Sequence, residues 1–212
     1  GSEPYSEETR NKIEKFFGID VYNSYGLSEM NGPGVAFECM EKDGMHLWED
    51  NFIMEIIDPE TGEKLPEGEK GELVLTTLCR EAMPILRYRT RDIVMIIPGK
   101  CKCGRTHRRI SRIIGRSDDM IIIRGVNIFP QQIEQVLMGI KAVAQNYQIV
   151  LEAYDQMTVR VEILKDLFDG RVEHLVNLQS EITEKLRSEI LVKPKVELLE
   201  PGTLPVTEGK AT

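Results

Sequence analysis

Four short stretches of the chain carry residue types that can bind a nucleotide. The first, Tyr22–Glu29, offers an aromatic ring at Tyr25, a turn at Gly26, the hydroxyl of Ser28 and a carboxylate at Glu29. An aromatic face can cover a purine, a hydroxyl can bind a phosphate and a carboxylate can hold Mg²⁺. Taken alone, this stretch is better explained as a turn beside a core tyrosine.

The second stretch is the pentapeptide that ends at Asp92. In an extended strand successive side chains alternate, so Tyr88, Thr90 and Asp92 share one face and the two arginines between them share the other. The two carboxylate oxygens of Asp92 can accept hydrogen bonds from a pair of neighbouring hydroxyls, such as those of a ribose. Without other signals, a surface strand with an ion-paired aspartate explains this pattern better.

The third and fourth stretches lie further along the chain, at a change of pattern and at the C-terminus. Gly115–Pro130 begins with a short polar element, which suits a hinge between two domains. Leu204–Lys210 ends in a lysine beside a glycine, and such a mobile point charge can bind a phosphate or an oxyanion. On its own, Lys210 is more typical of a frayed tail.

Two cysteines separated by one residue, Cys101 and Cys103, form half of a metal site. With Cys39 and His46, which lie on other predicted strand segments, they complete a set of three thiols and one imidazole, as in many structural zinc sites. His107 is the alternative fourth ligand. Buried free cysteines at strand edges are the competing explanation, because the spacing is not a double Cys-x-x-Cys. We expect a structural zinc ion here.

The elements that must position these residues form two groups. A helix is expected over 4–17, closed by Gly18, and from Ile19 the hydrophobic period changes to two, which predicts strands. The predicted strands are Val35–Cys39, Met45–Trp48, Ile53–Ile57, Leu73–Thr77 and Ile93–Ile97. Residues 1–117 are therefore expected to form a strand-rich, small barrel-like unit.

After Ser117 the expected order is strand, helix, strand, strand, helix, strand. Pro130 suits the first turn of a helix, where its missing N–H costs nothing. Residues 157–163 alternate between apolar and polar side chains as a half-buried strand does, and residues 172–190 follow helical spacing. The order βαββαβ is the ferredoxin-like arrangement. The fold class is thus α+β, with a compact second domain over 118–212.

Composition excludes several classes of protein. The chain has 212 residues, of which 41% are hydrophobic, and its net charge of −8 argues against a nucleic-acid coat. It has no apolar run of the roughly 20 residues that a membrane helix needs. Four cysteines in a chain of this size favour a reducing compartment. Lys100–Arg124 carries eight Lys or Arg against two Asp, which suits an anionic small ligand at a domain junction, or equally a solvated loop.

In this order and spacing, the four stretches resemble the adenylate-forming superfamily, which includes acyl- and aryl-CoA synthetases, peptide-synthetase adenylation domains and luciferases. Closer similarity is to phenylacetate–CoA ligases and the related coenzyme F390 synthetases. It rests on YGLSE, GEKGELVLTTLCREAMPILRYRTRD, CKCGRTHRRI and GRSDDMIIIRGVNIFPQQIE, and it covers nearly the whole chain. The resemblance implies that 1–117 is the C-terminal part of a large adenylate-forming domain and that 118–212 is a small mobile domain.

The resemblance also implies a role for each motif residue. The nucleotide-binding residues would be Tyr25, Gly26, Ser28, Asp92 and Arg116, with Asp92 on the ribose hydroxyls. The catalytic residues would be Glu29, as a Mg²⁺ ligand, and Lys210, as the adenylation lysine of LPVTEGK. Asp118 would be the hinge, and Gly125 would lie where coenzyme A approaches the acyl group.

The implied reaction converts phenylacetate, ATP and coenzyme A into phenylacetyl-CoA, AMP and pyrophosphate through an acyl-adenylate. The partners would be an aryl acid, ATP and coenzyme A, with no nucleic acid and no membrane. The protein would act in the cytoplasm, and whether it forms a homodimer is left undecided by the sequence. No Ser/Thr/Gly-rich phosphate loop precedes Tyr22, so we expect a C-terminal part of such a ligase that is inactive alone. The alternatives are a coenzyme F390 synthetase-like or other adenylate-forming enzyme and, from another class, a zinc-bearing basic module that binds nucleic acid.

Overall fold

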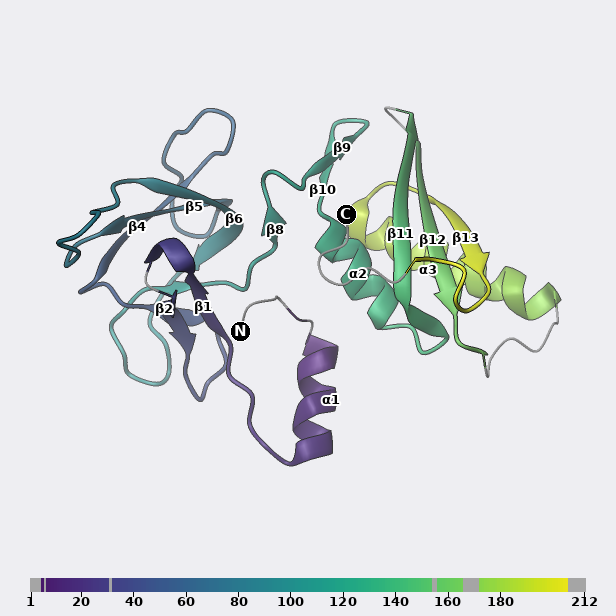
Figure 1. Ribbon diagram of the computed structural model, residues 1–212, viewed down its shortest axis with the longest axis horizontal. Helices are drawn as coiled ribbons and strands as arrows, with labels where there is room; N and C mark the ends of the chain where they lie inside the picture. The colour runs from purple at the N-terminus through teal and green to yellow at the C-terminus, as the bar shows by residue number, and fades with distance from the viewer. Residues whose placement is uncertain (1–4, 6, 31, 154–155, 166–171, 206–212) are drawn as a thin grey trace. The chain divides into compact units, whose positions relative to one another are not determined.

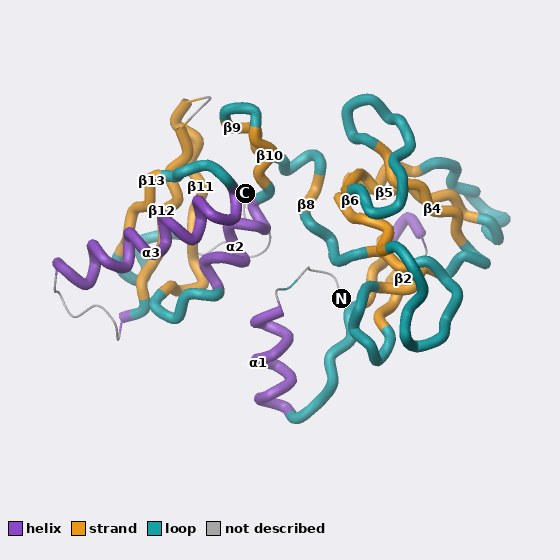
Figure 2. Tube along the Cα trace, turned by 180° about the vertical axis from the view of Figure 1, so that it is seen from behind, coloured by secondary structure: helices purple, strands orange, loops and turns teal. Residues whose placement is uncertain are grey.

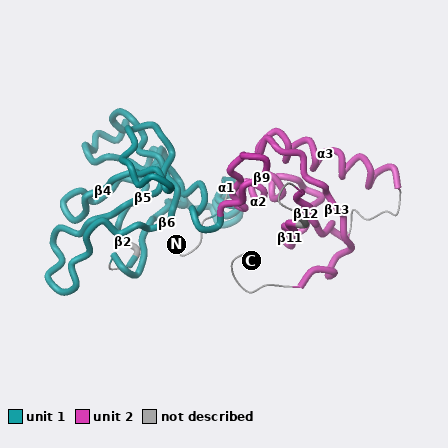
Figure 3. Tube along the Cα trace, turned by 90° about the horizontal axis from the view of Figure 1, so that it is seen from above, with its two compact units in different colours: residues 1–119 teal, residues 120–212 magenta. Residues whose placement is uncertain are grey.

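The computed structural model describes residues 5, 7–30, 32–153, 156–165 and 172–205. The chain divides into two compact units, residues 1–119 and 120–212, which Figure 3 shows in different colours. The boundary expected from the sequence lies after Ser117. Each unit has a hydrophobic core of its own and is described here by itself.

The first unit is built on one antiparallel sheet. Its elements are α1 (Glu7–Phe17), β1 (Ser24–Leu27), the 3-10 turn η1 (Ser28–Met30), β2 (Gly32–Glu38), β3 (Met45–Leu47), β4 (Phe52–Ile57), β5 (Lys70–Thr77), β6 (Tyr88–Ile97), β7 (Arg109–Ile110) and β8 (Gly115–Arg116). The strand order is β1-β2-β3-β7-β6-β5-β4, and β8 also pairs with β6 (Figure 1). The described strands thus form one continuous path from β1 to β4, and the first unit is strand-rich as predicted. The long strand β6 makes this path possible, because it pairs with β5 and β8 along its length and with β7 at its end.

An ion pair attaches the helix α1 to the sheet. The buried guanidinium of Arg10 donates two hydrogen bonds to the carboxylate of Glu38 on β2, at 2.8 and 2.6 Å. The helix ends as predicted at Gly18, which has a φ of 64° and donates its N–H to the Glu14 carbonyl at 2.9 Å. Phe16 and Phe17, the last two residues of this helix, are 81% and 65% exposed.

The second unit is a three-stranded sheet with two helices on one face (Figure 2). Its elements are β9 (Ile121–Ile123), β10 (Val126–Ile128), α2 (Pro130–Met138), β11 (Val143–Ala153), β12 (Gln156–Ile163), α3 (Val172–Ile190) and β13 (Lys195–Leu199). The central strand β12 pairs antiparallel with β11 and parallel with β13. The helix α2 begins at Pro130 as predicted. Among the described residues, no helix combines the length and apolar character that crossing a membrane requires.

The first strand of the expected βαββαβ order does not join this sheet. It pairs instead with β10 in a separate two-stranded hairpin. The reason is local: Arg124 and Gly125, which link the two strands, both have positive φ values of 52° and 77°, the geometry of a tight hairpin turn. The hairpin still contributes the buried side chains of Ile123 and Ile128 to the core of this unit.

Candidate functional site

Asp92 lies where strand β6 departs from regular pairing with β5. Across this irregularity, Leu73 alone faces residues 90–92. The Thr90 hydroxyl donates to the Leu73 carbonyl at 2.9 Å, and Arg91 takes a positive φ of 69°. A bulge of this kind turns side chains away from the regular alternation of a strand. Here it directs the carboxylate of Asp92 toward residues of β1 and β8.

Residues from three of the four stretches meet at the Asp92 carboxylate. The Tyr25 hydroxyl donates to Asp92 Oδ2 at 2.7 Å, and an Arg116 amino group donates to Asp92 Oδ1 at 3.4 Å. Pairing of β6 with β8 sets Asp92 directly opposite Arg116. The remaining nitrogens of Arg116 donate to both carboxylate oxygens of Asp118, at 2.9 and 2.8 Å. A ring, two carboxylates and a guanidinium therefore form one connected group.

The electrostatics of this group favour one protonation state for Tyr25 and one for Asp118. Burial and the neighbouring Asp92 charge raise the pKa of Tyr25, so its hydroxyl remains a hydrogen-bond donor at all ordinary pH values. The hydrogen bonds from Arg116 lower the pKa of Asp118, which stays ionised. At neutral pH the group therefore offers carboxylate oxygens to a ligand's hydroxyls and a guanidinium to its negative charge.

Glu29 lies beside this group, on the turn η1 that follows β1. Its exposed carboxylate accepts a hydrogen bond from the Tyr88 hydroxyl at 3.1 Å, and its main-chain carbonyl accepts one from Arg80. The pairing of β1 with β2 slips between Tyr25 and Leu27, so Gly26 occupies a bulge next to the turn. An exposed carboxylate on a rigid turn is the type of ligand that a hydrated Mg²⁺ ion takes from a protein.

Sequence reasoning missed the buried carboxylate that supports this group, that of Glu72 on β5, which is fully buried. It accepts two hydrogen bonds from Arg89, at 3.0 and 2.6 Å, and one each from the Arg91 backbone and the Ser117 hydroxyl, both at 3.3 Å. Burial alone would raise the pKa of Glu72, but the two arginines outweigh it and lower the pKa. Glu72 therefore fixes both the bulge and the segment after β8.

Nothing in the local sequence distinguishes Glu72 from a solvent-facing glutamate at the start of a strand. Tyr88 and Thr90 could be identified from the sequence, because they alternate along the predicted strand and share one face with Asp92. All three form hydrogen bonds at the site. The Tyr88 hydroxyl donates to Glu29, the Thr90 hydroxyl donates to the Leu73 carbonyl across the bulge, and Asp92 accepts from Tyr25.

Two of the predicted ligase residues, Gly125 and Lys210, belong to the second unit of the chain. Gly125 lies in the turn between β9 and β10, where a φ of 77° favours glycine. Lys210 lies outside the described residues.

The segment that leads to Lys210 is anchored by another buried carboxylate, Glu162 on β12. The Leu204 N–H donates to Glu162 Oε1 at 2.6 Å, the Asn146 side chain donates to Oε2 at 3.2 Å, and the backbone N–H groups of Gly202 and Thr203 also donate. Burial alone would raise the pKa of Glu162, but these donors outweigh it and lower the pKa. The carboxylate thus fixes the turn from which the LPVTEGK motif starts.

Replacing Glu162 with glutamine should loosen this turn, because the amide brings an N–H₂ group among backbone N–H donors. Leaving buried donors without an acceptor costs about 1–3 kcal/mol. Denaturant unfolding of the second unit and hydrogen exchange at the Leu204 amide would measure the effect. The exposed Glu189, changed to glutamine, is the control and should leave both unchanged. Equal exchange at Leu204 in the Glu162 variant and the parent chain would contradict the assignment.

Four of the eight Lys and Arg residues in Lys100–Arg124 form ion pairs with acidic residues of the first unit. The ion pairs are Arg108 with Glu49, Arg109 with Asp43, Arg112 with Glu7, and Arg116 with Asp92 and Asp118. These arginines therefore serve the fold and the site, which leaves less free charge for a nucleic-acid surface.

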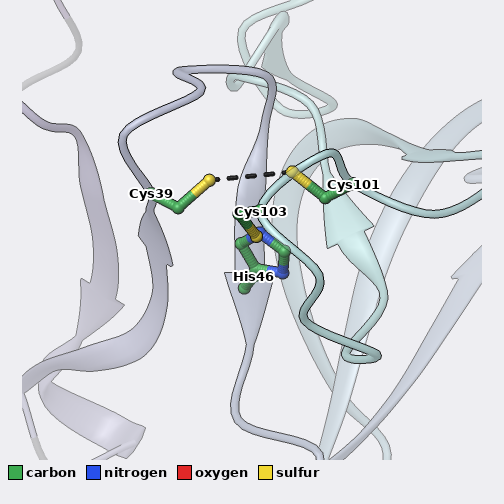
Figure 4. A group of neighbouring side chains, drawn as sticks. All are labelled: Cys39, His46, Cys101 and Cys103. Carbon is green, nitrogen blue, oxygen red and sulfur yellow. Dashed lines mark hydrogen bonds between the residues drawn. The ribbon is translucent and has the colours of Figure 1, made fainter.

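A second cluster in the first unit brings together the four predicted metal ligands. Cys39 directly follows β2, His46 lies on β3, and Cys101 and Cys103 lie in the loop 98–108 between β6 and β7 (Figure 4). One ligand atom from each residue lies within 4.8 Å of all the others. The Sγ atoms of Cys39 and Cys101 are 3.7 Å apart, and Cys103 Sγ lies 3.4 Å from His46 Nε2.

The surroundings of this cluster orient its members. His46 Nδ1 lies 3.3 Å from the main-chain carbonyl of His107, which leaves Nε2 facing the cysteines. His107, the alternative ligand, is not in this group of four, and its ring packs edge-on against Trp48. Burial raises the pKa of Cys39, whereas the Arg105 backbone N–H lowers the pKa of Cys103 to about 7.

Comparison with known proteins identifies the class to which this fold and site belong. Residues 125–212 match the model of the AMP-binding enzyme C-terminal domain. The structure superposes on a 2-hydroxyisobutyryl-CoA ligase in complex with R3-HIB-AMP with a TM-score of 0.84 and 30% identity, over 96% of this chain and 44% of that one. With the sequence relatives that follow, these matches show that the chain belongs to the adenylate-forming superfamily.

Within that superfamily the chain is similar along its whole length to phenylacetate–coenzyme A ligases. It is 45% identical to the enzyme of Thermus thermophilus over 99% of this chain and 51% of the relative. It is 41% identical to the enzyme of Escherichia coli K12 over 100% of this chain and 48% of the relative. The chain thus spans about half the length of the curated relatives that it matches.

Proposed function

We propose that the protein containing this chain is an ATP-dependent aryl-acid–CoA ligase. It converts phenylacetate, ATP and coenzyme A into phenylacetyl-CoA, AMP and pyrophosphate through an acyl-adenylate. The observation that carries the proposal is the meeting of Tyr25 and Arg116 at Asp92, in a chain 41–46% identical to phenylacetate–coenzyme A ligases.

The geometry of the site supports a role for each residue in binding ATP. Asp92 has two oxygens for the ribose hydroxyls, and its present donors, Tyr25 and Arg116, hold it in place. Gly26 and Ser28 follow Tyr25 on the bulge and turn, where a phosphate can approach the backbone closely. The carboxylate of Glu29 would hold Mg²⁺, which supplies positive charge to the phosphates when it is bound.

The two half-reactions require different groups at the same site. In the first, a carboxylate attacks the α-phosphorus of ATP and pyrophosphate leaves, so positive charge is required from Lys210. In the second, the coenzyme A thiol attacks the adenylate carbonyl and AMP leaves. We propose that residues 118–212 turn about Asp118 between the two steps, so that Lys210 serves the first and Gly125 lies near coenzyme A in the second.

Replacing Asp92 with asparagine in the full-length protein should raise the KM for ATP about tenfold or more. The reason is that a hydrogen bond to a charged acceptor contributes about 1.5–3 kcal/mol, and the amide offers one acceptor oxygen instead of two. Steady-state kinetics with varied ATP would measure this. Asp20, whose side chain is 72% exposed, provides the matched control as Asp20→Asn. An unchanged KM for ATP in the Asp92 variant would remove Asp92 from the nucleotide site.

The reaction itself is tested by supplying the full-length protein with ATP, coenzyme A and a panel of acids. We expect AMP release and thioester formation with phenylacetate, and weaker turnover of acetate and of 2-hydroxyisobutyrate, the acid that gives the similar solved ligase its name. If AMP is retained on an acceptor without any need for coenzyme A, the protein is a coenzyme F390 synthetase-like enzyme. A protein that turns over phenylacetate no faster than acetate is not an aryl-acid ligase.

A further inference from the structure

We propose that Cys39, His46, Cys101 and Cys103 bind one structural Zn²⁺ ion. This inference goes beyond the proposed ligase activity and does not depend on it, because it rests on a separate cluster of the first unit. The four side chains come from three segments that are distant in sequence, so only the folded unit brings them together (Figure 4).

Two of the distances between ligand atoms match those of a tetrahedral metal site, and all four ligand atoms lie within 4.8 Å of one another. Zinc binds cysteine sulfur at about 2.3 Å and histidine nitrogen at about 2.0–2.1 Å, so ligand atoms at the corners of such a tetrahedron are roughly 3.5–3.8 Å apart. The Sγ atoms of Cys39 and Cys101 are 3.7 Å apart, and Cys103 Sγ is 3.4 Å from His46 Nε2. A disulfide requires about 2.05 Å between its sulfurs, much less than this distance.

The burial and hydrogen bonding of the cluster also point to a cation. Cys39, His46 and Cys101 are only 6–7% exposed, and three thiols and a ring nitrogen facing one another gain little from mutual hydrogen bonds. The carbonyl of His107 accepts from His46 Nδ1–H, so the free electron pair of Nε2 is directed at the sulfurs. A carbonyl bound to the distal nitrogen is the usual support for a histidine that ligates a metal.

The ligand set identifies both the metal and its role. Three thiolates and one imidazole in a tetrahedron favour zinc over the hard ions Mg²⁺ and Ca²⁺, which prefer oxygen ligands. Four protein ligands leave no open position for water or substrate, so the ion would be structural. It would tie the β2–β3 hairpin to the loop 98–108, where Gly104 has a φ of 83° and donates its N–H to the Cys101 carbonyl at 3.2 Å.

The first test is metal analysis of the chain, purified under reducing conditions without chelators. We expect one zinc per chain by inductively coupled plasma mass spectrometry. In the variants Cys101→Ser and Cys103→Ser the zinc content should fall at least tenfold. The matched control is Cys79→Ser, because Cys79 is exposed and outside the cluster, and it should keep one zinc per chain. Four free thiols without zinc, or a Cys39–Cys101 disulfide, would overturn the proposal.

A second measurement avoids variants that could fail to fold. Zinc is removed from the parent chain and replaced by Co²⁺, which reports its ligands by its visible absorption. We expect the intense sulfur-to-cobalt charge-transfer bands and the strong visible bands of a tetrahedral thiolate site, and their displacement when zinc is added. A weak octahedral spectrum without sulfur bands would show that these thiols do not ligate the metal, and would overturn the assignment.

Discussion

Replacing Lys210 with alanine in the full-length protein should slow formation of the acyl-adenylate by roughly a hundred- to a thousandfold. An effect of this size is typical when one group that stabilises developing negative charge is removed. Adenylation joins two anions, the acid and ATP, so it depends on added positive charge. Attack of the coenzyme A thiol on the finished adenylate does not, so thioester formation from preformed adenylate should change little.

The two half-reactions can be measured separately. Acid-dependent exchange of pyrophosphate into ATP reports adenylation, and the conversion of synthetic phenylacetyl-adenylate to the thioester reports the second step. Lys185 on the outer side of α3 is half exposed, and Lys185→Ala is the control that should leave both rates unchanged. Equal losses in the two half-reactions of the Lys210 variant would refute its assignment as the adenylation lysine.

The second large effect is expected from Glu72→Gln, which should lower the free energy of unfolding of the first unit by about 3 kcal/mol. Removing one partner of a buried ion pair typically costs 3–5 kcal/mol, and Arg89, which is 37% exposed, can recover part of that from water. The variant also removes charged acceptors from the Arg91 N–H and the Ser117 hydroxyl. Urea unfolding measures the change, with the exposed Glu69, as Glu69→Gln, for control.

The same carboxylate predicts how stability depends on pH. The pKa of Glu72 is lower in the folded chain than in the unfolded one, so the unfolded state binds more protons as the solution becomes acidic. The stabilisation is fully present above the unfolded-state pKa, near 4.3, and is lost as the pH falls through the folded-state value. The parent chain should therefore lose stability in acid more steeply than Glu72→Gln. Parallel curves for the two proteins would contradict this account.

Periodicity predicted the positions of most helices and strands, because each element buries one face and repeats apolar residues at its own spacing. The helices at Pro130 and over 172–190, and the strands near 53–57 and 157–163, lie where the pattern placed them. Periodicity could not specify partners. The pattern of β9 is that of any short strand, and only the turn at Arg124 and Gly125 determines that it pairs with β10 rather than with the main sheet.

The site shows the same division between composition and geometry. The stretches around Tyr25, Asp92 and Arg116 could be singled out from residue type and order, because few residue types can bind hydroxyl and phosphate groups. Their meeting at one carboxylate depends on the bulge in β6 and on the pairing of β6 with β8. Glu72 could not be found from the sequence, since its burial arises from strands that lie far apart along the chain.

By itself, the sequence determined the superfamily through the resemblance of its motifs, and its local pattern and composition indicated the two-part organisation and the residue types available for chemistry. The tertiary structure decided which of these side chains meet. It directs Asp92 toward Tyr25 and Arg116, and it places His46 rather than His107 among the three cysteines. The physical reason is that contacts between distant segments depend on strand register, bulges and left-handed turns, and a single residue of difference in any of these moves a side chain to the opposite face.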